Sequence, residues 1–167
     1  MSNIFTKRLT LLKSDAGKPE LELMVQWLND PVVVQYSEQR HQHHDIETQQ
    51  QYIQDTDIFR EIHTHQGRFI GTITANIDRP NSVADVGILI GEKEEWGKGY
   101  GFEAWKGFCD HLFTHGMRKI EAGTMRNNRS MRVIFNRYDM VQEGIRFDHF
   151  LYDKETYSDM LLYGKFA

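Results

Sequence analysis

The chain has 167 residues, of which 40% are hydrophobic and 26% charged, a balance typical of one globular domain and unlike that of disordered or fibrous proteins. Its formal net charge of −4 argues against general binding to nucleic acid and favours a cationic or amine-bearing partner, and no apolar run approaches the ~20 residues of a membrane-spanning helix. The single cysteine, Cys109, fits a reducing compartment, so we expect one cytoplasmic domain over residues 1–167.

The first third of the chain predicts one strand and a set of short helices. Residues 1–13 alternate instead of forming an apolar block, which argues against a signal peptide and predicts a strand over 8–13. Apolar residues at helical spacing predict a helix over 20–27, and Pro31 is placed to begin a short helix through Val34. A polar loop then leads to Asp45, the expected N-cap of a helix that reaches about residue 53.

The remainder alternates between strands and helices. Segments rich in β-branched residues and separated by turns predict an antiparallel meander of three strands, over 58–65, 68–77 and 83–90. The elements expected after it are a helix over 102–115, a strand over 118–123, a helix over 130–138 and two strands over 143–152 and 157–166. Together these elements predict an α+β domain built on a mixed sheet.

A glycine-rich turn, Gly97-Lys98-Gly99-Tyr100-Gly101, lies between a predicted strand and an amphipathic helix. Glycines leave backbone N–H groups open to an anion, because no Cβ obstructs the approach. The following helix adds unpaired N–H groups and the positive end of its dipole. The turn therefore predicts a phosphate or pyrophosphate site.

Three other interpretations of the turn compete with this one. A P-loop is rejected, because Gly91 and Gly97 stand one residue too far apart and Gly99 replaces the Ser or Thr that would hold magnesium. The dinucleotide fingerprint fits Gly99-x-Gly101-x-x-Ala104, but residues 92–96 separate strand from glycines and too little chain follows for a doubly wound sheet. Such an oxidoreductase would bind NAD and not coenzyme A. The third is a glycine loop without a ligand.

The segment 86–90 followed by Trp96–Ala104 resembles the main motif of the GNAT superfamily of acyl-CoA N-acyltransferases, Arg/Gln-x-x-Gly-x-Gly/Ala. Trp96 stands where the general family has Arg or Gln, which is similar to the branch of ribosomal-protein alanine and spermidine acetyltransferases. A second family motif, Asn-x-x-Ser followed by Tyr, Lys and Gly-Phe, aligns loosely. Its positions are taken here by Asn128, Met131, Phe135, Arg137, Asp139 and Met140.

This resemblance implies a GNAT-like α+β fold, with a central splayed and mostly antiparallel sheet of about seven strands flanked by about four helices. It also implies acetyl-CoA as co-substrate, with its pantetheine arm between the strand ending at Ile90 and the strand Ile120 to Thr124. Asn128 would bond the pantetheine or stabilise the next helix. The residues expected to bind coenzyme A are Ile88, Leu89, Ile90, Trp96, Gly97, Lys98, Gly99, Tyr100, Gly101, Asn128 and Phe135.

Amide formation from a thioester needs a neutral amine, a donor for the oxyanion and a proton for the departing thiolate. Asp85, on the strand that enters the site, is the expected base, although it equally fits the polar face of a strand. The family tyrosine that protonates the thiolate is replaced by Phe135, so Ser130 and Tyr138 are the nearby substitutes.

The loop before residue 45 covers the acceptor pocket in this family, so Tyr36, Glu38 and Arg40 are expected to bind the acceptor. Residues 37–40 look like the loop of relatives that act on amino sugars. The nearby histidines at 41, 43 and 44 lack a recognised zinc spacing, and no metal is expected.

The resemblance therefore predicts an N-acetyltransferase that moves an acetyl group to a primary amine by direct attack in a ternary complex. The acceptor would be a small amine, an amino sugar or a protein N-terminus, and relatives commonly form homodimers. The alternative is a non-catalytic coenzyme A-binding module, which the replacement by Phe135 favours.

Overall fold

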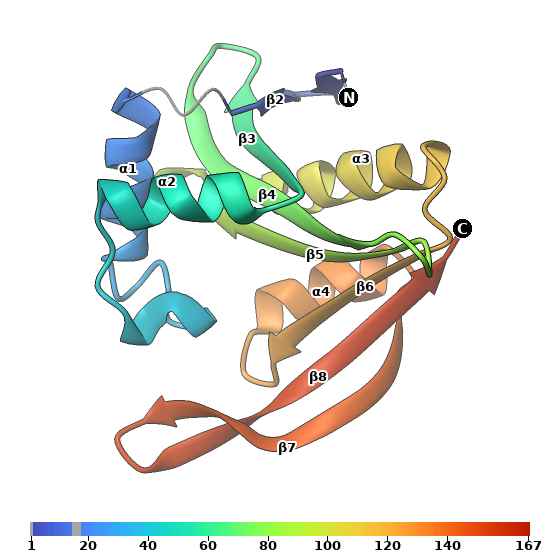
Figure 1. Cartoon of the computed structure of the whole chain (residues 1–167). Helices are drawn as coiled ribbons and strands as arrows, with labels where there is room; N and C mark the ends of the chain where they lie inside the picture. Colours follow the sequence, from blue (N-terminus) through green and yellow to red (C-terminus); the bar gives the residue numbers. More distant parts are fainter. Residues whose placement is uncertain (1, 15–17) are drawn as a thin grey trace.

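A computed structural model of the chain describes residues 2–14 and 18–167 (Figure 1). Its described part contains one 8-stranded sheet, in the order β1-β2-β3-β4-β5-β6-β8-β7. The strands are β1 (Ile4–Phe5), β2 (Leu9–Lys13), β3 (Ile58–Thr64), β4 (Phe69–Asp78), β5 (Val83–Ile90), β6 (Lys119–Met125), β7 (Val141–Asp153) and β8 (Thr156–Phe166). The seven expected strands and the α+β class are confirmed, and the two-residue β1 is an addition.

The sheet splits where β5 meets β6. This is its parallel pair, and it joins only Val83–Asp85 to Lys119–Glu121, whereas the other neighbouring strands pair antiparallel. Beyond that point β5 stays bonded to β4, and β6 stays bonded to β8. Each strand follows its own antiparallel partner, so the sheet opens in a V between them (Figure 1).

Four α-helices and two short 3₁₀ helices complete the described fold: α1 (Lys18–Leu28), η1 (Glu38–His41), α2 (Ile46–Asp55), η2 (Lys93–Glu95), α3 (Tyr100–Thr114) and α4 (Arg129–Arg137). Asp45 caps α2 as expected, in a reciprocal capping box with Thr48. The helix expected over 31–34 is wrong, because these residues form turns. Three consecutive valines disfavour a helix there, and Asp30 holds the turn by accepting from the Val32 N–H at 2.9 Å.

Two apolar cores hold the helices to the sheet. The larger one joins α3 and α4 to strands β2 to β6 and to β8, with Trp105, Phe108 and Phe135 fully buried. The smaller one joins α1 to β3 and β4 through Trp27, Phe59 and Phe69. None of the helices in the described part of the chain has the length and apolar character needed to span a bilayer.

Candidate active site

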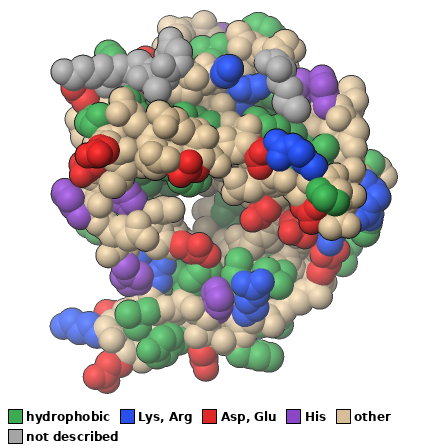
Figure 2. All heavy atoms as spheres, viewed as in Figure 1, with side chains coloured by type: hydrophobic (Ala, Val, Ile, Leu, Met, Phe, Trp, Pro, Cys, Tyr) green, Lys and Arg blue, Asp and Glu red, His purple; other side chains and the backbone are tan. Residues whose placement is uncertain are grey.

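A cleft of about 1110 Å³ opens where β5 and β6 separate. It is lined by residues of α1, η1, α2, β4 and β5 on one side, and of the glycine turn, β6 and α4 on the other. Figure 2 shows the molecule hollowed between its α1–α2 side and the β7–β8 hairpin. A smaller cavity of about 350 Å³ lies at the hairpin and shares Gln35 with the cleft.

The glycine turn takes the backbone conformation that the sequence predicts. Gly97 and Gly99 have φ of 75° and 83°, a left-handed region that side chains disfavour. Gly99 is the N-cap of α3 without a side-chain cap, and the first helical hydrogen bond runs from the Glu103 N–H to the Gly99 carbonyl. The N–H groups of residues 100–102 therefore have no helical acceptor, and these residues line the cleft. Unpaired N–H groups at a helix N-terminus can bind an anion.

Side chains fix the turn against β5 and α4. The Trp96 indole N–H donates to the Ile90 carbonyl at 2.8 Å, which ties the turn to the end of β5. A Cβ on Gly101 would lie 3.2 Å from Cδ1 of Ile134, so α3 and α4 approach closely at this glycine. Trp96, Gly101 and Ile134 all line the cleft.

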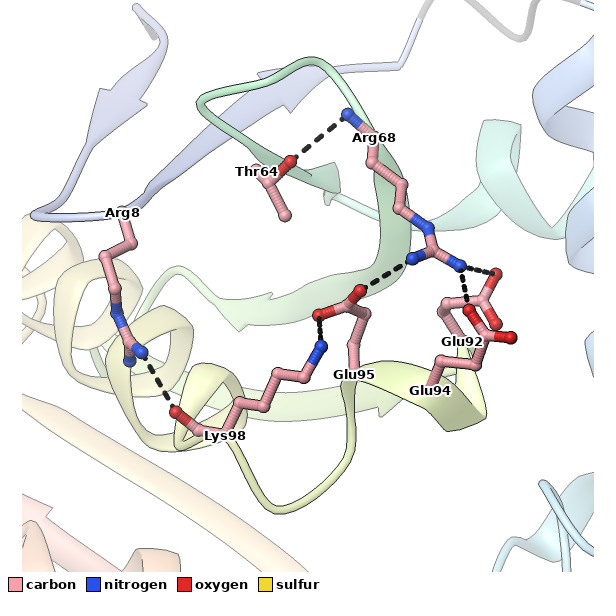
Figure 3. A network of polar contacts seen from close by, with 7 residues as sticks. All are labelled: Arg8, Thr64, Arg68, Glu92, Glu94, Glu95 and Lys98. Carbon is pink, nitrogen blue, oxygen red and sulfur yellow. Dashed lines mark hydrogen bonds and ion pairs between the residues drawn. The ribbon is translucent and has the colours of Figure 1, made fainter.

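The cations beside the turn are paired with carboxylates, and Figure 3 shows these contacts for Lys98 and Arg68. Arg8 pairs with Glu103 at 2.6 Å and also donates to the Lys98 carbonyl at 3.0 Å. The Lys98 ammonium pairs with the buried Glu95 at 2.8 Å, and its residue is not among those that line the cleft. Arg68 bonds three carboxylates, those of Glu92, Glu94 and Glu95. This network of three cations and four carboxylates positions the turn but adds no net positive charge to it.

Asp85 lies at the fork of the sheet. It is paired with Glu121 in the last β5–β6 register position before the strands diverge, and it lines the cleft. Although the side chain reaches solvent, the walls of the cleft desolvate it, and this raises the pKa of Asp85 above its ordinary value. The charges of Glu121 and then Glu38 add to the rise. A carboxylate with a raised pKa is a stronger base, which suits proton removal from an amine.

The predicted proton donors are separated by the fold. Ser130 is exposed in the first turn of α4 and lines the cleft, as does the buried ring of Phe135. Tyr138 does not line the cleft, contrary to expectation, because its hydroxyl donates to Asp110 of α3 at 2.8 Å. Burial and that hydrogen bond raise the pKa of Tyr138 well above its usual range. The structure therefore brings Asp85 and Ser130 to one cleft and leaves Tyr138 outside it.

The predicted acceptor residues are likewise divided. Tyr36 and Glu38 line the cleft, and the Tyr36 ring lies parallel to Tyr152 of the hairpin with centroids 6.5 Å apart. Arg40 lines the small cavity instead, and its guanidinium donates to the carbonyls of Ser37, at 2.6 Å, and of Leu151. Arg40 thus joins the loop to the hairpin and does not face the cleft as expected.

Asn128 lines the cleft and stabilises α4, one of the two roles expected for it, because its side chain accepts from the Met131 N–H at 3.2 Å. Three other residues of the cleft extend what the sequence predicts. Thr72, Thr74 and Asn76 of β4 line the cleft and were missed. Their signal is the alternation of polar residues along a strand that is otherwise apolar.

The chain matches the family model of the acetyltransferase (GNAT) domain over residues 8–141. It is 28% identical over 160 residues to the uncharacterized N-acetyltransferase p20 of Bacillus licheniformis, which covers 89% of this chain and 88% of that protein. Its fold is similar to that of a spermidine N-acetyltransferase from Vibrio cholerae solved with CoA and spermine, with a TM-score of 0.83, 18% identity and 95% of each chain covered. It is also similar to an acetyl transferase from Salmonella typhimurium that modifies the N-terminal serine of a 50S ribosomal subunit protein, with a TM-score of 0.79, 17% identity, and 97% and 96% of the chains covered.

Proposed function

Because the chain belongs to the GNAT family of acetyltransferases, and is therefore an acyl-CoA N-acyltransferase with acetyl-CoA as its co-substrate, we propose that it acetylates a primary amine by direct attack in a ternary complex. The acceptor is a small amine, an amino sugar or a protein N-terminus. The names of the relatives support the amine class, since one acts on spermidine and another on an N-terminal serine.

The observation that carries this proposal is that one cleft holds both an anion site and a base. The unpaired N–H groups of residues 100–102 suit the pyrophosphate of coenzyme A. The edge of β5 beyond Asp85 faces β6 without a strand partner, so the backbone groups of this segment that point away from β4 are available to the pantetheine amides. An extended arm along that edge leads from the turn toward Asp85.

In the proposed reaction the thioester supplies an acyl carbonyl with a tolerable thiolate leaving group. The amine nitrogen attacks that carbonyl carbon, so a C–N bond forms and the C–S bond breaks. Asp85 accepts the proton that the amine loses, directly or through water. A backbone N–H of β5 near Leu89 donates to the oxyanion, and Ser130 or solvent returns a proton to the thiolate.

The test begins with thermal stability in the presence of acetyl-CoA, with NAD as control. Ligand at ~100 times its dissociation constant adds about 2.7 kcal/mol, a rise of several degrees in Tm. Thiol release from acetyl-CoA is then measured over a panel of polyamines, amino sugars and peptides with free N-termini. We expect a Tm shift with acetyl-CoA alone and thiol release with one class of acceptor. A protein stabilised by NAD and not by acetyl-CoA would refute the proposal.

A second candidate is a coenzyme A-binding module without turnover. Phe135 at the family tyrosine position favours it, and so does the engagement of the Tyr138 hydroxyl with Asp110 outside the cleft. This alternative predicts the same Tm shift with acetyl-CoA but no acceptor-dependent thiol release across the panel. If any amine is acetylated and the rate falls when Asp85 is replaced, this alternative is excluded.

A further inference from the structure

The positive charge beside the glycine turn is neutralised within the protein. Each of Arg8, Lys98 and Arg68 pairs with at least one carboxylate at 2.9 Å or less. Figure 3 shows these pairs for Lys98 and Arg68. Trp96, which stands where the general family has Arg or Gln, contributes no charge. A pyrophosphate bound here would meet helix N–H groups but no free cation of the turn itself.

Arg137, in the last turn of the neighbouring helix α4, supplies that cation. Its guanidinium carbon lies 4.0 Å from the ring centroid of Phe102, a residue of the first turn of α3. Both residues line the cleft. Since the helices also approach closely at Gly101 and Ile134, the guanidinium lies at the first turn of α3, the turn that carries the three unpaired N–H groups.

The charge of Arg137 is not used inside the described structure. None of the ion pairs among the described residues includes Arg137, and its side chain is exposed. The Phe102 face holds the guanidinium by a cation–π contact while leaving its N–H donors free. A planar guanidinium matches two phosphate oxygens at once. The other arginine of the cleft, Arg129, lies eight residues earlier on α4, roughly 12 Å along the helix.

We propose that Arg137 binds the pyrophosphate of coenzyme A, together with the N–H groups of residues 100–102. The positive charge that Trp96 does not supply on the turn is thus supplied from α4. This inference rests on acetyl-CoA as the co-substrate and not on the identity of the amine. The attraction is screened by salt, so the contribution of Arg137 to binding falls as ionic strength rises.

The experiment compares Arg137→Gln with Arg132→Gln by calorimetric titration. Arg132 is exposed on the same helix but does not line the cleft, so its substitution removes the same charge from α4 elsewhere. We expect acetyl-CoA to bind roughly ten-fold more weakly to Arg137→Gln and unchanged to Arg132→Gln, because a charge-assisted contact to phosphate is lost in the first variant only. Arg137→Lys should recover part of the loss.

Titration with acetyl-dephospho-CoA, which lacks the 3′-phosphate, separates the two phosphate groups. The pyrophosphate assignment predicts the same roughly ten-fold loss with this ligand. If Arg137→Gln weakens binding of acetyl-CoA but not of acetyl-dephospho-CoA, the contact is with the 3′-phosphate and the assignment is overturned. Equal binding of acetyl-CoA by Arg137→Gln and the unsubstituted chain would also overturn it. The Tm without ligand checks folding, since a purely structural role would lower it. If coenzyme A binds with this pattern but no amine is acetylated, the proposed function fails and this assignment stands.

Discussion

The two walls of the cleft are built from different parts of the chain. The coenzyme wall, which we define as Gly97 to Phe102, presents backbone N–H groups whose direction is set by glycines at positive φ. The acceptor wall, which we define as η1 with its preceding loop and the facing residues of β4 and β5, presents side chains such as Tyr36, Glu38 and Asp85. Recognition by the backbone requires glycines at particular positions, whereas side chains on the acceptor wall can be replaced without changing the backbone. We therefore expect substitutions on the two walls to differ in their effects on unfolding stability and on kinetic constants.

The largest effect is expected at Asp85. Asp85→Asn keeps the shape of the side chain but cannot accept a proton, so kcat should fall by ~10²–10³. Acetyl-CoA affinity should stay unchanged, because the coenzyme wall is intact. Since the base acts when ionised and its pKa is raised, activity of the unsubstituted protein should increase as pH rises through that raised pKa. The variant should lose this dependence, as measured by kcat against pH.

Asp85→Asn, which should lower kcat, should not lower the stability of the fold. A carboxyl whose pKa is higher in the folded state than in the unfolded state loses stability as pH rises from the unfolded toward the folded value. At neutral pH the ionised Asp85 is therefore unfavourable to folding, and Asp85→Asn should unfold at an equal or higher temperature. A variant that loses both activity and stability would indicate that Asp85 supports the sheet and is not the base.

The next effect is expected on the coenzyme wall. Gly99→Ala forces a side chain into φ of 83° and should cost about 1–2 kcal/mol of unfolding free energy. Acetyl-CoA affinity should fall as the N–H groups lose their alignment. Gly116→Ala is the matched control, because Gly116 has φ of 93° just after the C-terminal end of α3 and no neighbour within 4 Å of an added Cβ. Gly116→Ala should lose similar stability and bind acetyl-CoA normally. Equal losses of acetyl-CoA affinity in both variants would show that the backbone of the turn has no special role in binding.

The difference between the walls also explains what the sequence could predict. The glycine turn, the seven strands and the Asp45 cap depend on local spacing, so they were predicted. Arg40 was misplaced because its contact with the Leu151 carbonyl spans 111 residues, and no local pattern records such a contact. Tyr138 was misplaced for a similar reason, since its partner Asp110 lies on another helix. Sequence patterns therefore predict backbone conformation more readily than the long-range contacts of individual side chains.

A smaller effect is expected from the cap of α2, the helix beside the acceptor wall. Asp45→Ala removes the acceptor for the Thr48 N–H, and Tm should fall by ~2–4 °C. Asp45→Asn is the control, because an amide oxygen also caps a helix. If the walls are independent, KM for acetyl-CoA should stay constant in Asp45→Ala while KM for the amine changes. A changed acetyl-CoA KM would show that the acceptor side also shapes the coenzyme wall.

The smallest effect is expected from Glu38, whose charge acts on Asp85 across the cleft. Glu38→Gln removes one of the charges that raise the pKa of Asp85, so the rise of kcat with pH should move to lower pH. KM for a cationic amine should increase by roughly 1.5- to 5-fold, the range of exposed charge contacts, and stability should hardly change. Glu47→Gln is the control, because Glu47 is exposed on α2 and does not line the cleft. A pH profile that stays in place while the amine KM rises would mean that Glu38 contacts the acceptor without tuning the base.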